Sequence, residues 1–94
     1  MKHEAVVRFL SREEGGRISP PLSGYKPHVK ILNEHTSCRI TPKNINNEEM
    51  GFGIDHEVFI EFQYETQFSD KINERLNIGL YEGKKLVGHG YLVS

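Results

Sequence analysis

Apolar and polar residues alternate along most of the chain, and a period of two is typical of a strand that buries one face. In the first such segment, Ala5, Val7 and Phe9 share one face, while Glu4 and Arg8 occupy the other. Four further segments follow the same pattern, with these apolar positions: Val29 and Ile31; Cys38 and Ile40; Val58, Ile60, Phe62 and Tyr64; Leu76, Ile78 and Leu80. We therefore expect five strands that each turn one face toward a shared core.

A sixth segment, residues 86–93, is apolar on both sides. Its two sides are Leu86, Gly88, Gly90 and Leu92, and Val87, His89, Tyr91 and Val93. This pattern predicts a final strand that is covered on both faces.

Turn-forming residues separate these segments. The stretch from Arg12 to Gly24 contains paired glycines and paired prolines, which predicts neither helix nor strand. Residues 42–50 are rich in Asn and Glu and indicate a loop, and Glu82-Gly83 indicates a tight hairpin. Residues 67–74 fit either one helical turn or a plain loop.

Six short strands with regular turns predict a single all-β domain over residues 1–94, either a sandwich or a closed barrel. Closure would remove exposed sheet edges, and Gly88 and Gly90 suit a strongly coiled barrel strand.

The composition changes this picture little but narrows the functional classes. No apolar run is long enough to span a membrane and the start of the chain lacks a secretion signal, so we expect a cytoplasmic protein. Cys38 is the only cysteine, which excludes an internal disulfide. The chain has eight Lys or Arg against four Asp or Glu up to residue 47, and four against nine from residue 48. A basic half suits a phosphate partner, although a barrel would interleave the two halves and make this ordinary solvated charge.

Three ordered blocks resemble the C-terminal (third) domain of bacterial elongation factor Tu. They are Leu10-Ser11-Arg12-Glu13-Glu14-Gly15-Gly16-Arg17 with Ser19-Pro20 and Gly24-Tyr25-Lys26-Pro27; Glu49-Met50; and Glu82-Gly83-Lys84-Lys85-Leu86-Val87-Gly88-His89-Gly90. The resemblance covers essentially the whole chain and implies a six-stranded antiparallel closed β-barrel of Greek-key type. The chain departs from the family at Gly53-Ile54-Asp55, Ile18, His28 and Tyr81, and it has no Gly-rich phosphate loop of a GTPase.

The resemblance also implies a surface that grips the T stem of aminoacyl-tRNA. The positions that carry over as RNA-binding residues are Arg17, His28, Ser37, Glu82 and Gly83. Ile18 falls at a further tRNA-facing position but cannot donate a hydrogen bond. Three residues also have a structural alternative: a salt bridge to Glu13 or Glu14 for Arg17, a hairpin glycine for Gly83, and a surface aromatic instead of a base-stacking platform for Tyr81.

Catalysis, a metal and a cofactor are not expected. The five histidines lie on different segments, and no pair of them has ligand spacing with Cys38, which we expect to be a buried apolar residue. Asp55 and His56 are strand neighbours and therefore point to opposite faces.

The sequence leaves three functional hypotheses open, all of them non-catalytic. The first is protein–protein contact with a translation factor, its ligand, or a regulator or toxin that targets it. The second is binding of tRNA or another structured RNA, and the third is an immunity-type or decoy protein that mimics the elongation factor. Neither DNA nor a membrane is an expected partner.

Overall fold

The computed structural model describes residues 2–31, 34–44, 46, 48–63 and 76–93. Its elements are β1 (Lys2–Phe9), a short 3₁₀ helix η1 (Arg12–Glu14), β2 (His28–Ile31), β3 (Glu34–Pro42), β4 (Asp55–Phe62), β5 (Asn77–Glu82) and β6 (Lys85–Leu92). The stretch from Arg12 to Gly24 was expected to contain neither helix nor strand, and the single 3₁₀ turn η1 corrects that expectation. Tyr64 and residues 67–74, for which predictions were made, lie outside the described residues.

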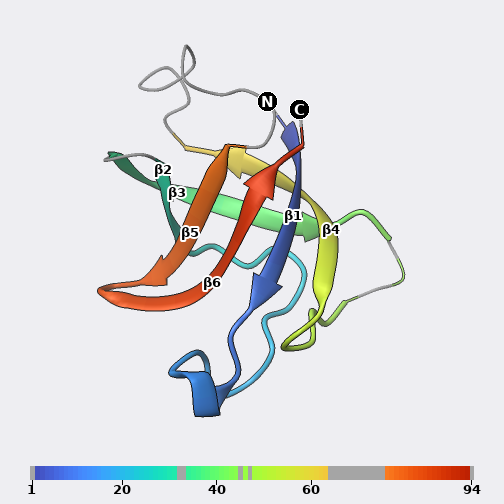
Figure 1. The fold of residues 1–94 in the computed structure, drawn as a ribbon. Helices are drawn as coiled ribbons and strands as arrows, with labels where there is room; N and C mark the ends of the chain where they lie inside the picture. Colours follow the sequence, from blue (N-terminus) through green and yellow to red (C-terminus); the bar gives the residue numbers. More distant parts are fainter. Residues whose placement is uncertain (1, 32–33, 45, 47, 64–75, 94) are drawn as a thin grey trace.

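The six strands close into one antiparallel barrel in the order β1-β4-β3-β2-β5-β6 (Figure 1). Strands β2, β3 and β4 lie side by side in chain order. Strand β1 lies beside β4, and a long connection joins its end to β2. This 1-4-3-2 order is a Greek key, which confirms the expected closed barrel and its topology.

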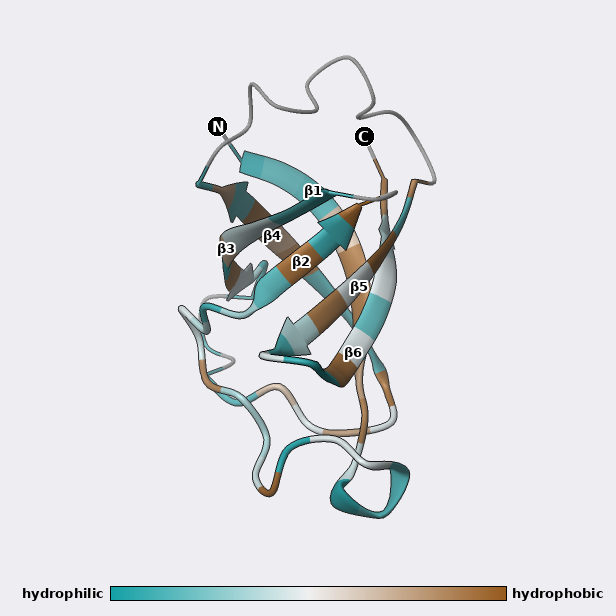
Figure 2. Ribbon diagram, turned by 90° about the vertical axis from the view of Figure 1, so that its left-hand side faces the viewer, coloured by the Kyte–Doolittle hydropathy of each residue, from teal (hydrophilic) through white to brown (hydrophobic). Residues whose placement is uncertain are grey.

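The alternation in the sequence places the core inside the barrel, and Figure 2 shows apolar and polar positions succeeding one another along β2 and β5. All the described inward positions of the first five predicted strands are buried except Leu76, which packs against the core from its edge. The buried apolar side chains are Ala5, Val7, Phe9, Val29, Ile31, Cys38, Ile40, Met50, Val58, Ile60, Phe62, Ile78, Leu80, Val87 and Leu92.

Strand β6 does not follow the prediction of a strand covered on both faces. Its outer side carries exposed His89, and Leu86 is 37% exposed. The ladder between β5 and β6 shifts between Leu80, which pairs with Gly88, and Tyr81, which pairs with Leu86. Val87 is the extra residue of this β-bulge, so it and Gly88 are both buried. The apolar residues on both sides therefore mark a change of phase and not a second covering layer.

The barrel closes where β6 meets β1, and a glycine makes this contact possible. Gly90 pairs with Val7, and a Cβ atom on Gly90 would lie 2.0 Å from the carbonyl oxygen of Val6. Real Cβ atoms essentially never come this near to another heavy atom. The expectation that glycines in this segment permit close backbone approach is therefore confirmed.

The two long connections, residues 10–27 and the described residues of 43–54, lie together beyond one end of the barrel (Figures 1 and 2). They are joined by backbone hydrogen bonds from Ser23 N–H to Glu48 O (2.7 Å) and from Met50 N–H to Pro21 O (2.8 Å). Met50 is fully buried and anchors this end to the core.

The barrel interleaves the basic and acidic halves of the chain, as expected for this topology. Arg8 pairs with Asp55 across β1 and β4 (3.0 Å), and Lys43 lies within 4.0 Å of Glu57. These ion pairs locally neutralise charges of the basic half with charges of the acidic half. A charged patch therefore depends on which side chains share a surface and not on their order in the sequence.

Candidate functional site

Arg17 and Glu82 are 65 residues apart in the chain and are in contact next to the turn of the β5–β6 hairpin. One terminal nitrogen of the Arg17 guanidinium donates to the Glu82 carboxylate, and the Tyr25 hydroxyl donates to the same carboxylate oxygen. Arg17 Nε also donates to the carbonyl oxygen of Ser19 at 3.0 Å. The guanidinium carbon lies 4.7 Å from the centre of the Tyr25 ring, within cation–π range. We call Arg17, Tyr25 and Glu82 the corner cluster.

The charges of the corner cluster are mutually satisfied. The hydrogen bond from Tyr25, together with the contact with Arg17, lowers the pKa of Glu82 despite its partial burial. Burial and the neighbouring carboxylate raise the pKa of the Tyr25 hydroxyl. Glu82 is therefore an anion and Tyr25 a neutral donor at neutral pH, and Arg17 balances Glu82.

The expected alternative for Arg17, a salt bridge with Glu13 or Glu14, is wrong in its partner. Glu14 instead accepts hydrogen bonds from the backbone N–H of Ser11 (2.9 Å) and from its hydroxyl (3.0 Å). The backbone hydrogen bond is the main cause that lowers the pKa of Glu14. Glu14 of the 3₁₀ helix thus forms its hydrogen bonds with Ser11 at the start of the same turn, and Arg17 pairs with Glu82 of the hairpin instead.

His28 and Ser37 are direct cross-strand partners on β2 and β3, and Tyr81 of β5 is the partner of His28 on the other side. All three alternate with buried residues and therefore point outward. In the next row along the same strands, Lys30 pairs with His35. We call the five outward residues His28, Lys30, His35, Ser37 and Tyr81 the polar face.

The aromatic member of the polar face, Tyr81, lies flat on the outer surface of the barrel. Its ring centre is 6.2 Å from that of His35, and a Cβ on Gly79 would come 3.0 Å from the Tyr81 ring. Gly79 therefore gives the ring room to lie against β5. This arrangement agrees with the surface-aromatic alternative and still leaves Tyr81 partly exposed.

Gly83 forms the hairpin turn that the sequence predicted. It has φ of 63°, and Glu82 pairs with Lys85 to close a loop of two residues. A Cβ at Gly83 would meet nothing within 4 Å, so the left-handed backbone, and not crowding, favours glycine. Gly83 is exposed and directly follows Glu82 of the corner cluster.

The five residues selected by resemblance fall into two groups: His28 and Ser37 on the polar face, and Arg17, Glu82 and Gly83 at the hairpin. Tyr81 belongs to the polar face through its pairing with His28, whereas Glu82, the next residue of β5, contacts Tyr25, which packs against the core. Ile18 is 79% exposed and belongs to the long loop instead.

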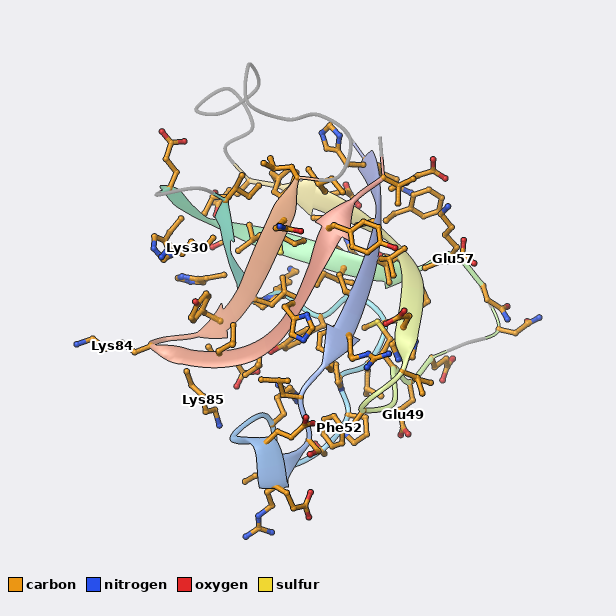
Figure 3. The ribbon with its side chains drawn as sticks, viewed as in Figure 1. Lys30, Glu49, Phe52, Glu57, Lys84 and Lys85 are labelled. Atoms are coloured by element: carbon orange, nitrogen blue, oxygen red, sulfur yellow. The ribbon has the colours of Figure 1, made fainter. Side chains whose placement is uncertain are left out.

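Sequence reasoning missed several cations around this surface. Figure 3 shows Lys30, Lys84 and Lys85 extending from the β2 and hairpin side, whereas Glu49 and Glu57 lie on the opposite side near β4. Within the described part of the chain, none of these three lysines has a carboxylate oxygen within 4.0 Å. The signal was present in the alternation, since Lys30 shares the outward phase of His28.

Cys38, Asp55 and His56, the residues considered above for nucleophilic or acid–base chemistry, lie in the barrel strands. Cys38 is buried, its Sγ lies 3.6 Å from the carbonyl oxygen of Pro27, and burial raises the pKa of the thiol to about 12. Asp55 is exposed and His56 buried on opposite faces of β4, as expected. His56 Nε2 lies 2.7 Å from the carbonyl oxygen of Gly51.

Among the described residues, no three His, Cys, Asp or Glu side chains gather as metal ligands would. No described helix has the length and apolar character needed to cross a membrane. A scan against protein-family models found no match to the chain.

Proposed function

We propose that this chain is a non-catalytic binding module of the elongation factor Tu C-terminal type, and that its polar face binds the sugar–phosphate backbone of a structured RNA. One observation carries the proposal: His28 and Ser37 lie side by side on an outward face that also carries Lys30, and Arg17 and Glu82 meet next to Gly83 at the neighbouring hairpin, although these residues are far apart in the chain.

The chemistry of the polar face suits a backbone contact. Lys30 supplies charge, Ser37 and the histidines supply hydrogen-bond donors, and the Gly83 N–H is open to an acceptor. Such groups meet phosphate and ribose 2′-hydroxyls, which are the exposed features of an A-form stem. A single partly exposed aromatic, Tyr81, offers little for reading a run of unpaired bases.

The corner cluster has a positioning role in this proposal. The charge of Arg17 is balanced by Glu82, so Arg17 contributes less to phosphate binding than an unpaired cation would. Because the cluster ties the long loop to the hairpin, it fixes where Gly83 and the adjacent lysines stand.

A short RNA hairpin and the full chain provide the test, with fluorescence anisotropy measured over a salt series. Lys30→Gln should weaken binding on the order of tenfold at low salt, as expected for a lost charged hydrogen bond. It should also reduce the slope of log affinity against log salt by about 1. Arg12→Gln removes the same charge from η1 and should change neither quantity appreciably.

Two results would contradict the proposal. One is no RNA binding at low salt by the folded wild-type chain. The other is an equal loss in Lys30→Gln and Arg12→Gln, which would mean that only net charge is sensed and not the polar face.

A second candidate function, contact with a protein, is favoured by the long connections. Ile18, Leu22 and Ile54 are 79%, 61% and 56% exposed, and all belong to the joined loops at one end of the barrel. Exposed apolar side chains mark an interaction surface where they form one contiguous patch, and a protein partner at this end would have to cover all three. The partner in this proposal is a component of the translation machinery, or a regulator or toxin that targets it, which includes the decoy hypothesis.

Affinity capture from cell extract tests this second candidate. Leu22→Asp with Ile54→Asp should abolish recovery of a specific protein. Val93→Asp, which alters an exposed apolar residue outside these loops, should leave recovery unchanged. Recovery of RNA alone by the wild-type chain would argue against a protein partner.

A further inference from the structure

A depression of about 420 Å³ lies over β3 and β4, next to the polar face. It is lined by Lys26, Ser37, Cys38, Arg39, Glu61, Phe62 and Gln63. Its volume falls in the range of roughly 300–1,000 Å³ that small-molecule sites occupy. Of these residues, only Ser37 was selected by the resemblance.

Two cations face each other directly at this depression. His28 pairs with Ser37 and Tyr25 bridges to Ile40, so the register places Lys26 opposite Arg39. Backbone hydrogen bonds from Cys38 N–H to Pro27 O (3.0 Å) and from Ile40 N–H to Tyr25 O (2.8 Å) hold the two segments together. Like charges directly opposite on paired strands destabilise the pairing unless something compensates them.

The protein compensates this pair only in part. Arg39 also stands opposite Glu61 of β4, which in turn stands opposite Lys2 of β1. This row, across β1, β4, β3 and the segment that precedes β2, therefore holds three cations and one carboxylate. Neither Lys26 nor Arg39 has a carboxylate oxygen of a described residue within 4.0 Å.

The side chain of Arg39 turns toward the long loop. A Cβ on Gly24 would lie 3.7 Å from Arg39 Nε and 3.8 Å from one terminal nitrogen, so the guanidinium passes beside this glycine. Arg39 is exposed and is one of the residues that line the depression.

We propose that Lys26 and Arg39 form a phosphate-binding pocket, and that Ser37 and Glu61 at its floor and far side bind a hydroxyl group attached to the same ligand. The ligand class is a phosphate ester of a hydroxylated sugar. The two cations bind the phosphate, because charge-assisted hydrogen bonds to Arg and Lys are the strong ones. The carboxylate of Glu61 accepts from the sugar hydroxyl.

This inference rests on the proposed function, since a ribose phosphate of an RNA strand on the polar face is one source of such a ligand. A free sugar phosphate is the other source. The pocket can be tested without RNA, so the two ideas can fail separately.

The first arm of the experiment titrates inorganic phosphate and ribose 5-phosphate into the ¹⁵N-labelled chain and follows amide shifts by NMR. Both should give saturable shifts at residues 26, 37–39 and 61, with ribose 5-phosphate binding more tightly. Arg39→Gln should weaken both about tenfold and keep a dispersed spectrum, since Arg39 stands exposed on its strand. Arg12→Gln should bind as the wild type does.

The second arm repeats the RNA hairpin titration with Arg39→Gln. A lower affinity and a salt slope reduced by about 1 would identify RNA as the source of the phosphate. Saturable binding of ribose 5-phosphate without any RNA binding would support the pocket and overturn the proposed function.

The pocket itself is overturned if phosphate shifts do not saturate or are the same in Arg39→Gln and wild type. RNA binding whose affinity and salt slope are unchanged in Arg39→Gln would instead exclude RNA as the source of the phosphate.

Discussion

The closure of the barrel at Gly90 makes a quantitative prediction for Gly90→Ala. The added methyl group would lie 2.0 Å from the Val6 carbonyl oxygen and 2.8 Å from the Val7 Cα, both of them backbone atoms that cannot rotate away. Relief requires β6 to move from β1 by more than an ångström, which lengthens the hydrogen bonds that close the barrel.

The expected cost has two parts. Overpacking of a tight site costs about 1–3 kcal/mol, and each weakened backbone hydrogen bond adds about 1 kcal/mol. We expect a total loss of about 2–4 kcal/mol in the free energy of unfolding. With a urea m value of roughly 2 kcal/mol/M, in the middle of the range for small proteins, the midpoint should fall by about 1–2 M.

Gly51→Ala is the matched control, because a Cβ at Gly51 meets nothing within 4 Å. This substitution should change stability by no more than about 1 kcal/mol, and in the stabilising direction if the backbone accepts alanine. Urea unfolding followed by circular dichroism measures both variants. Equal midpoints for Gly90→Ala and Gly51→Ala would refute the argument that close approach of β6 and β1 requires glycine.

Three further predictions concern the corner cluster and the buried thiol. Tyr25→Phe should lower stability at neutral pH by about 1–2 kcal/mol in urea unfolding, because the Glu82 carboxylate loses a hydrogen-bond donor; an unchanged midpoint would show that water replaces the hydroxyl at no cost. Folding lowers the pKa of Glu82, so its contribution to the free energy of unfolding is present above the unfolded pKa of about 4.3 and is lost as pH falls through the folded pKa. Wild type should therefore lose more stability than Glu82→Gln between roughly pH 6 and pH 3, and parallel losses in the two proteins would contradict this assignment. Burial raises the pKa of Cys38 to about 12, so a thiol reagent at neutral pH should label the native chain only as fast as it unfolds, and rapid labelling without denaturant would contradict its burial.

The alternation of the sequence was sufficient to predict the strands and most of the core. Ala5, Val7 and Phe9 are buried as expected because a period of two leaves a strand only one way to face a core. The choice of a barrel over a sandwich came from the resemblance, since alternation alone is the same in both.

The pairing of distant residues could not be read from the sequence. The contact of Arg17 with Glu82 depends on how a long loop crosses the open end of a barrel, and nearby Glu13 and Glu14 were the obvious local partners. The opposition of Lys26 and Arg39 likewise requires the register of β2 against β3, which a single strand pattern does not contain.

The bulge at Val87 was hidden for a different reason. A bulge changes which side of a strand faces inward, and this change is visible only where one side is clearly polar. Residues 86–93 are apolar on both sides, so a regular strand and a bulged strand have the same pattern there.

The bulge also determines where the chain can change length. Elsewhere in the barrel, deletion of one strand residue turns every later side chain of that strand to the opposite face. At Val87 the partner strand already skips one residue, because Tyr81 pairs with Leu86 and Leu80 with Gly88. Removal of Val87 would leave a regular ladder with all other pairs unchanged, at the cost of one buried side chain and of the hydrogen bond from Leu10 N–H to its carbonyl. Position 87 is thus the place in the described strands where a single-residue deletion spares the register, and homologous barrels that differ by one residue in this hairpin would keep the same face toward a ligand.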